Sequence, residues 1–302
     1  MSQTTATLPA REFTRGGPRV PIVGFGAEAL GRKGRLLADA ERTLHAVVDA
    51  GVTLIDTASS YGNSERFVGA ALASRRDEIT IVTKCGWSEA LEPRWTAAEI
   101  AATVEASLEA LRTDRIDVLL LHSCPLETLE RGEAIEAIER LRRAGKARFI
   151  GYSGDNEALA YAVASGRFDA IETTLNILDR ANAPTIVSAA ERGMAVLAKR
   201  PIANAVPGRT ERPRSEYAAQ YWPRWEAFAP RCERRDDAAW REIAMRFTAH
   251  AEGVTSALVG SSHAAHVIEI ARAASDGRLP QATLAALDSA YERVGSSWPA
   301  LG

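Results

Sequence analysis

The chain has 302 residues and a mass of 32.5 kDa, and 46% of its residues are hydrophobic, which is enough for a sizeable buried core. Its formal charge of -2, from 37 basic and 39 acidic side chains, gives no electrostatic reason to expect nucleic acid or an anionic membrane as a partner. No apolar run approaches the ~20 residues that a membrane-spanning helix needs.

Strand patterns and helix patterns alternate along the whole chain. In the first half we predict strands at 20–25, 52–55, 79–83 and 116–121, and helices at 39–50, 64–73, 96–111 and 133–144. In the second half we predict strands at 147–152, 168–174, 194–198 and 254–259, and helices at 157–165, 184–192, 237–251, 264–274 and 281–294. Eight strand–helix pairs with apolar strands predict a (β/α)₈ TIM barrel that forms a single domain over 1–302.

The main alternative to a barrel is a doubly wound open sheet. Such a sheet more often carries the glycine pattern G-x-G-x-x-G after its first strand, and residues 24–29 lack the third glycine. One stretch, at about 204–236, interrupts the alternation and is rich in proline, arginine and aromatic residues. Because long loops in compact domains are usually functional, we expect a folded lid or a wall of the substrate site there.

The cysteines and the first residues of the sequence are typical of a cytoplasmic protein. Cys85, Cys124 and Cys232 are odd in number and show no pair spacing, which favours reduced thiols over a disulfide framework. The segment 1–9 lacks the basic and apolar regions of a secretory signal. We therefore expect a cytoplasmic protein.

Polar residues able to do chemistry stand where three successive strands end. Asp56, Lys84 and His122 each close an apolar strand, and Tyr61 follows in the turn after the first of these strands. Each alone has an ordinary interpretation, as a cap, a solvated lysine, a core histidine or a surface tyrosine. In a barrel, however, the carboxyl ends of the strands form the active face, so their joint placement favours a catalytic site.

These four side chains suit the reduction of a carbonyl group. Tyr61 can donate a proton to the developing alkoxide, although its ordinary pKa near 10 is high, and we expect Lys84 to lower that pKa. Asp56 would pair with Lys84, and His122 would supply a second hydrogen bond to the carbonyl oxygen. None of the four carries out the redox step, which requires a nicotinamide cofactor.

The motif that runs from Asp56-Thr-Ala through Tyr61-Gly-Asn-Ser-Glu65, with the strand ends at Lys84 and His122, resembles the aldo-keto reductases. The resemblance covers about 20–274. It implies a (β/α)₈ barrel in which Asp56, Tyr61, Lys84 and His122 form the catalytic tetrad. It also implies NADPH, with NADH possible, bound extended across the barrel mouth, and reduction of a small-molecule aldehyde or ketone.

The same resemblance implies a set of cofactor contacts, some of which depart from the family pattern. Gly154 stands where the family has asparagine, Glu172 where it usually has glutamine, and Lys199 where an aromatic residue often stacks on the nicotinamide. A cationic Lys199 would oppose the oxidised ring; the alternative is that Lys199 and Arg200 contact the phosphates of the cofactor. The expected cofactor-binding residues are Gly26, Ser153, Glu172, Lys199, Arg200, Ser261, Ser262, His266 and Glu269.

The expected substrate walls are the segment 28–35 after the first strand, Trp87, and the aromatic loop at 217–228 with Trp222 and Trp225. The sequence leaves the substrate open. Two other functions stay open: the same site acting as an alcohol or sugar dehydrogenase, and a cofactor-binding redox sensor or regulatory subunit with little turnover. Only His122 of the five histidines ends a strand, so we expect no metal site. We expect a monomer or a weak homo-oligomer.

Overall fold

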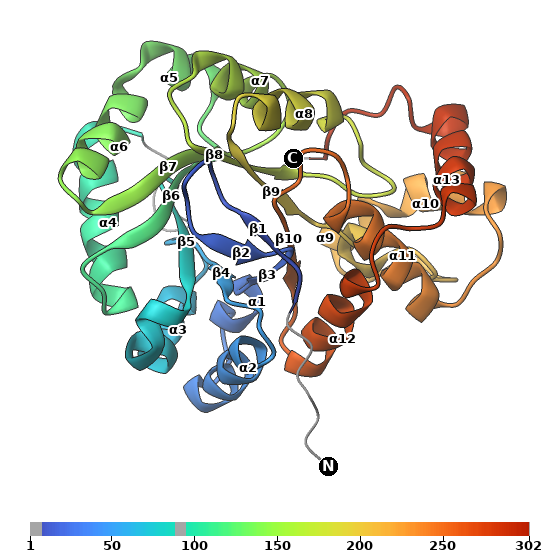
Figure 1. The fold of residues 1–302 in the computed structure, drawn as a ribbon, viewed down its shortest axis with the longest axis horizontal. Coiled ribbons are helices and arrows are strands. Elements are labelled where there is room, and N and C mark those ends of the chain that lie inside the picture. Colours follow the sequence, from blue (N-terminus) through green and yellow to red (C-terminus); the bar gives the residue numbers. More distant parts are fainter. Residues whose placement is uncertain (1–7, 88–94, 302) are drawn as a thin grey trace.

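Eight parallel strands close into a barrel in the order β10-β3-β4-β5-β6-β7-β8-β9 (Figure 1). The computed structural model describes residues 8–87 and 95–301, so most of the segment 1–9, in which no secretory signal was expected, lies outside the described residues. The barrel strands are β3 Val23–Gly26, β4 Leu54–Asp56, β5 Thr80–Cys85, β6 Ile116–His122, β7 Ala147–Ser153, β8 Ala170–Thr174, β9 Ala195–Lys199 and β10 Ser256–Gly260. The predicted TIM barrel is confirmed.

Helices surround the barrel on all sides of Figure 1. The larger ones are α2 Leu37–Asp49, α3 Ser64–Leu72, α4 Ala97–Leu111, α6 Glu133–Arg143, α7 Asn156–Ser165, α8 Ala183–Glu191, α11 Asp237–Ala249, α12 Ala264–Ser275 and α13 Gln281–Val294. Thr96, predicted to cap α4, accepts a hydrogen bond from the Glu99 amide. Shorter helical pieces escaped prediction because they are too brief for a periodic pattern: α1 Glu28–Gly31, α5 Leu126–Arg131 and the 3₁₀ turns η1 Ala73–Glu78, η2 Ala203–Ala205 and η3 Ala229–Arg231.

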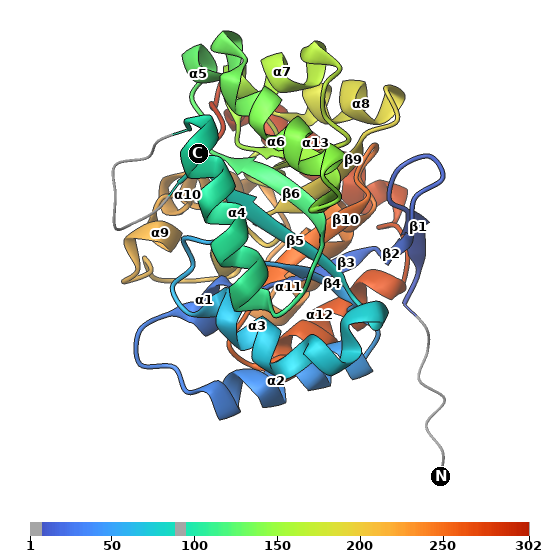
Figure 2. The ribbon, with the colours of Figure 1, turned by 90° about the vertical axis from the view of Figure 1, so that its left-hand side faces the viewer.

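The start of the barrel differs from the prediction. The expected strand at 20–25 is divided, because β2 Arg19–Pro21 pairs antiparallel with β1 Ala10–Glu12 before β3 begins at Val23. This hairpin lies at one end of the barrel, opposite the end that carries α1 and α9, as Figure 2 shows. Phe13 and Val20, both at most 2% exposed, pack into the inner core cluster and so close that end of the barrel.

The inward-facing rows of the barrel change from apolar to polar toward the carboxyl ends of the strands. Leu54, Val82, Leu120, Ala170 and Leu197 belong to the inner core cluster. Because side chains alternate along a strand, the residue two positions later faces the same way. The rows therefore continue with Asp56, Lys84, His122, Glu172 and Lys199 at the mouth of the barrel.

The stretch at 204–236 is largely folded. It contains α9 Glu216–Ala219 and α10 Trp222–Phe228. Tyr221, Trp225 and Phe228 are buried together with Trp240 of α11, and α10 also contacts α13. Among the described residues, no helix is long and apolar enough to cross a membrane.

Candidate active site

Lys84 lies at the centre of a buried polar cluster inside the barrel. Its ammonium Nζ is 2.5 Å from Asp56 Oδ1 and donates to the carbonyl of Thr57 at 3.0 Å. The same Nζ lies 3.2 Å from Glu172 Oε2. Lys84 is 0% exposed and both carboxylate residues are at most 5% exposed, so the ammonium is held between two carboxylates away from water.

The turn after β4 places Tyr61 beside Lys84. Two glycines fix this turn, because a Cβ at Gly31 would lie 1.8 Å from the Tyr61 carbonyl oxygen, and one at Gly62 would lie 2.5 Å from the Gly31 oxygen. The Lys84 Nζ lies 5.2 Å from the centroid of the Tyr61 ring. The His122 ring meets the Tyr61 ring edge-on, with centroids 5.9 Å apart. The four predicted residues therefore come together.

The local environment sets the proton state of each group. Burial lowers the pKa of Lys84, but the carboxylates of Asp56 and Glu172 more than reverse this, so its pKa lies above the ordinary value. Burial, with repulsion from Lys84 and Lys199, lowers the pKa of His122 to about 3. Lys84 is therefore charged and His122 neutral at neutral pH.

The pKa of Tyr61 differs from the expectation. Burial raises it above its ordinary value, and the carboxylates of Asp56 and Glu172 add to this, whereas Lys84 lowers it by less. The prediction that Lys84 brings the Tyr61 pKa down considered neither burial nor a second carboxylate. Tyr61 is therefore a fully protonated donor at neutral pH in the structure.

A cleft of about 840 Å³ opens above this cluster. Tyr61 and His122 line it, as does the predicted substrate-wall residue Trp87, whose ring centroid lies 5.6 Å from that of His122. The other lining residues are mostly polar or charged: Glu28, Gly31, Arg32, Lys33, Ser60, Gly62, Asn63, Ser123 and Tyr217. Tyr217 comes from the stretch at 204–236, in agreement with the expected wall.

The two other tryptophans of the expected wall lie elsewhere. Trp225 is 5% exposed, donates to the Arg209 carbonyl at 3.0 Å and packs edge-on against Trp240. Trp222 packs against the same core cluster, and neither residue is among the described residues that line the cleft. These two side chains pack into an apolar core between α10, α11 and α13. Their position in a long loop of the sequence did not reveal this packing.

The expected cofactor contacts near the nicotinamide lie at the mouth. Ser153, 1% exposed, donates to Glu172 Oε1 at 3.2 Å. Lys199 forms an ion pair of 2.9 Å with Asp155, a residue that the sequence analysis did not single out. Despite burial, Lys199 and nearby hydrogen-bond donors lower the pKa of Asp155, so it is a carboxylate that neutralises Lys199. Gly26 ends β3 next to Gly260 of β10.

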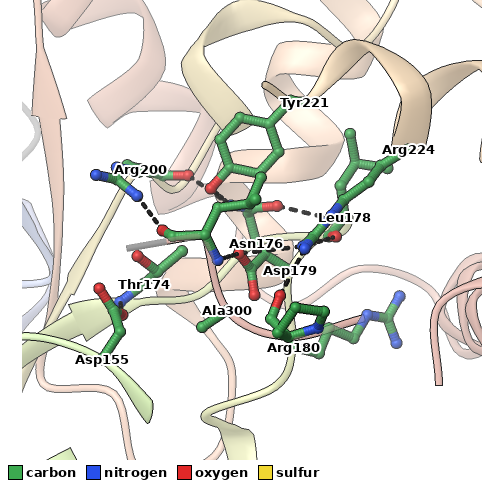
Figure 3. Close-up of polar contacts among 12 residues, drawn as sticks. Asp155, Thr174, Asn176, Leu178, Asp179, Arg180, Arg200, Tyr221, Arg224 and Ala300 are labelled. Carbon is green, nitrogen blue, oxygen red and sulfur yellow. Dashed lines mark hydrogen bonds and ion pairs between the residues drawn. The ribbon is translucent and has the colours of Figure 1, made fainter. Parts of the chain in front are cut away.

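Arg200 contributes to a polar network that ties down the end of the chain (Figure 3). Its guanidinium donates to the carbonyl of Leu301 and, at 2.7 Å, to the hydroxyl of Tyr217. The Leu301 amide donates to Asp179 Oδ2 at 2.9 Å, and Arg224 contacts the same carboxylate at 3.2 Å. The segment at 299–301 thus lies over the carboxyl ends of β8 and β9.

The residues expected at the adenosine end of a cofactor lie around the start of α12. The Ser261 hydroxyl accepts from the His263 amide at 3.1 Å, whereas His266 and Glu269 are exposed on α12. Ser262 lines a hollow of about 430 Å³ together with Arg35, which precedes α2, and Arg42, which lies within it. The sequence analysis missed these arginines, because only the packing of α2 on α12 brings them there.

Among the described residues, no group of three or more histidine, cysteine or carboxylate side chains is arranged to hold a metal ion. Cys85 and Cys124 are buried, and burial raises the pKa of both thiols, that of Cys124 to about 12. These thiols are protonated at neutral pH and contribute no nucleophile to the site.

A (β/α)₈ barrel with a tyrosine, a lysine, a histidine and an aspartate gathered at its mouth defines a class of carbonyl-reducing enzymes. A model of the aldo/keto reductase family matches residues 22–292, and the chain belongs to this family. It is therefore an oxidoreductase that depends on a nicotinamide cofactor, which in this family is generally NADPH. Its general reaction is the reduction of carbonyl compounds.

Several relatives match over most of their length. L-galactose dehydrogenase of Arabidopsis thaliana is 26% identical over 97% of this chain and 97% of that protein. D-threo-aldose 1-dehydrogenase of a Pseudomonas species is 29% identical over 86% of this chain and 91% of that protein. The solved structure of the aldo-keto reductase AKR11C1 of Bacillus halodurans, in its holo form, is 25% identical, with a TM-score of 0.80 over 94% of this chain and 96% of that one.

Proposed function

We propose that this protein reduces a small aldehyde or ketone to the alcohol, with the hydride from a nicotinamide cofactor and the proton from the hydroxyl of Tyr61. The observation that supports this most directly is the placement of Tyr61 and His122 on the wall of one cleft, above the buried ion pair of Lys84 and Asp56. In this cleft, the phenol of Tyr61 can act as the acid for a carbonyl oxygen, and the imidazole of His122 can form a hydrogen bond with it.

Each member of the tetrad has a separate task. Burial keeps Tyr61 protonated until an alkoxide develops next to it. The Lys84 ammonium, 5.2 Å from the ring centroid, then stabilises the phenolate that remains. Asp56 holds Lys84 in place, and His122, neutral because its pKa is about 3, orients the carbonyl oxygen.

The residues at the mouth fit a nicotinamide cofactor, which when bound supplies the hydride. Gly26 and Gly260 carry no side chain where β3 and β10 meet at the mouth, so the backbone there is open to close approach. Ser153 and Glu172 present polar groups that suit the carboxamide, with Lys199 and Arg200 nearby. Ser261 and Ser262, with His266 and Glu269 farther along α12, would border the adenosine phosphates.

NADPH is the cofactor that we expect the protein to prefer, with NADH also used. Arg35 and Arg42 share the hollow of Ser262, and arginine guanidinium groups favour a phosphate monoester such as the one that distinguishes NADPH. Arg42 also pairs with Asp39, which reduces its effective charge and leaves room for NADH.

A second candidate is oxidation of a sugar alcohol group by the same site. The cleft is lined mostly by hydrogen-bonding side chains, including Glu28, Arg32 and Asn63, which suit a polyhydroxylated substrate better than an apolar one. The two dehydrogenases named above, which act on L-galactose and on D-threo-aldoses by their names, are similar over most of their length. Hydride transfer is reversible, so one site can serve both directions.

The test is to replace Tyr61 by phenylalanine and to follow oxidation of the reduced cofactor with a panel of small aldehydes, ketones and sugars. Removing the acid should lower kcat/KM by about a thousand-fold, while the cofactor still binds, because the phenol acts only in the reaction. Cofactor binding is followed separately, by quenching of tryptophan fluorescence.

The matched control is Tyr161→Phe, which makes the same chemical change on α7, away from the cleft, and should leave kcat/KM as in the wild type. Equal turnover by wild type and Tyr61→Phe would refute the role of Tyr61. Cofactor binding by the wild type without any turnover would favour the redox sensor or regulatory subunit instead.

A further inference from the structure

Tyr217 brings a phenol from the stretch at 204–236 to the wall of the cleft that also holds Tyr61 and His122. It lies on α9, a helix of four residues, and its side chain is 42% exposed. So short a helix and so exposed a ring do not fix where the phenol points, because a rotamer is fixed by close packing in a core. Hydrogen bonds must therefore set its position.

Arg200 and Asn204, in the segment after β9, supply these hydrogen bonds. The Arg200 Nε donates to the Tyr217 hydroxyl at 2.7 Å, and its Cζ lies 5.0 Å from the centroid of the ring. The Asn204 Nδ2 donates to the Tyr217 carbonyl at 2.9 Å. A hydrogen bond from a cation is about twice as strong as one between neutral groups. Tyr217 is thus held at its backbone and at its hydroxyl.

Arg200 is itself held firmly. Its guanidinium also donates to the Leu301 carbonyl, and the Asn176 Nδ2 donates to the Arg200 carbonyl at 3.1 Å. The backbone of Arg200 has a φ of 56°, a left-handed conformation that is uncommon for residues other than glycine. Such a conformation persists only where the surroundings enforce it. The turn after β9 is therefore fixed from several sides.

The segment 299–301, to which Arg200 is anchored, is a rigid support (Figure 3). Each of its backbone amides and carbonyls is hydrogen-bonded to a side chain. Two of these side chains, Asp179 and Arg224, are at most 7% exposed and form an ion pair of 3.2 Å. The full set of side chains that bind the segment is Asn156, Asp179, Arg200 and Arg224.

The Tyr217 hydroxyl keeps a hydrogen atom that it can donate. Its oxygen accepts from Arg200, and among the described residues it has no other hydrogen-bond partner. A hydroxyl that accepts from a cation is polarised, which strengthens the hydrogen bond that it donates. In the proposed reaction, Tyr61 and His122 already bind the carbonyl oxygen of the substrate. The acceptor for Tyr217 is therefore a second oxygen atom of the substrate.

We propose that Arg200 is a positioning residue that fixes Tyr217, and that Tyr217 determines specificity by donating to an oxygen group remote from the reacting carbonyl. The substrate class is an aldehyde or ketone that carries a hydroxyl or carboxylate group. The mostly polar lining of the cleft suits such a group. Arg200 then has a task other than the cofactor contact expected from its place after β9. This inference rests on the proposed function.

The experiment compares pairs of substrates that differ in the second oxygen group. The pairs are 4-carboxybenzaldehyde with 4-methylbenzaldehyde, and glyceraldehyde with propanal. The measured quantity is the kcat/KM of the oxygenated member divided by that of the plain member. Tyr217→Phe should lower this ratio about tenfold, because it keeps the ring and removes the donor. The loss should fall on the oxygenated member.

Arg200→Met tests the positioning role, because methionine is a long side chain that cannot donate. The same ratio should fall by about threefold or more, since the phenol remains but is no longer fixed. The double variant should lower the ratio no further than Tyr217→Phe alone, because Arg200 acts on the substrate only through that hydroxyl. The matched control is Arg209→Met: Arg209 lies in the same stretch, donates to the Ala205 carbonyl and should leave the ratio unchanged.

The dissociation constant of the reduced cofactor separates the two tasks of Arg200. Weaker binding of the cofactor by Arg200→Met, with an unchanged substrate ratio, would overturn the positioning role and make Arg200 a cofactor contact. If Arg200→Met does not fold, Arg200→Lys takes its place, because it keeps a cation near Leu301 but loses the planar guanidinium that reaches Tyr217.

The outcomes also separate the inference from the proposed function. An unchanged ratio in Tyr217→Phe for both pairs, with turnover that depends on Tyr61, would overturn the inference alone. A wild type that reduces only the plain member of each pair would overturn it as well. A wild type that turns over no compound of the panel would overturn the proposed function.

Discussion

His122 is a residue of the site through which mild acid lowers the stability of the fold. Burial, Lys84 and Lys199 lower its pKa to about 3, from an ordinary value of 6.5. The unfolded chain therefore takes up a proton on this histidine near its ordinary pKa, whereas the folded protein does not. The stability that neutral His122 contributes is present above about pH 6.5 and is lost as the pH falls toward 3.

Replacement of His122 by glutamine should reduce this dependence on pH. Between about pH 7 and about pH 5, the free energy of unfolding of the wild type should fall by about 2 kcal/mol more than that of His122→Gln. Urea unfolding at both pH values measures the difference. The other histidines are present in both proteins, so their contributions cancel in the comparison. Equal losses of unfolding free energy in the wild type and in His122→Gln would show that folded His122 takes up a proton as readily as the unfolded chain.

At the scale of elements, one cation adds to the apolar packing that holds the last helix. Arg180, in the loop between β8 and α8, lies 4.5 Å from the ring centroids of both Phe247 and Tyr291. It also donates to Asp288 at 2.7 Å. The first ring belongs to α11 and the other two partners to α13, so the guanidinium joins the two helices. The segment at 299–301, which lies over the carboxyl ends of β8 and β9, follows α13 after residues 295–298.

Removal of this cation should weaken the attachment of α13. We expect Arg180→Ala to lower the free energy of unfolding by about 2–3 kcal/mol, since it loses two cation–π contacts and a charged hydrogen bond in a half-buried setting. Arg180→Lys keeps the charge but not the planar guanidinium, so its free energy of unfolding should lie between those of the wild type and Arg180→Ala. Chemical unfolding measures both. Equal stability of the alanine variant and the wild type would contradict this role of Arg180.

At the scale of the whole molecule, the two ends of the barrel have separate tasks. The carboxyl ends of the strands carry the tetrad and the cleft, whereas the β1–β2 hairpin closes the opposite end (Figure 2). Phe13 packs there against Phe149, with ring centroids 5.4 Å apart, and is 2% exposed. In barrels of this kind, residues at the closed end serve stability and those at the open end serve catalysis.

Truncation of Phe13, which helps to close this end of the barrel, should therefore affect stability and not activity. Phe13→Ala should cost about 3–5 kcal/mol of unfolding free energy, because it leaves a cavity among packed side chains. At a temperature where the variant remains folded, its kcat/KM should equal that of the wild type. Thermal unfolding and steady-state kinetics on one preparation check both parts. A loss of activity without a loss of stability would place Phe13 in the function of the mouth.

Long apolar strands and amphipathic helices were predictable because each has a period that shows in the sequence, and the predicted ends lie within a few residues of the observed ones. The hairpin strands Ala10–Glu12 and Arg19–Pro21 were not, since three residues show no period. Trp225 was misplaced for another reason: only packing with α11 and α13 decides whether an aromatic side chain in a long loop faces a cleft or a core.

The sequence by itself predicted the barrel and the meeting of Asp56, Tyr61, Lys84 and His122 at its mouth, because a local pattern of strand ends and one contiguous motif encode both. Only the tertiary structure decided the charges at the mouth. It set Glu172 against Lys84, Asp155 against Lys199 and Arg35 near Ser262, pairs that are far apart in the sequence. The physical reason is that a pKa or a charge balance depends on burial and on distances between remote segments, which exist only after the barrel has closed.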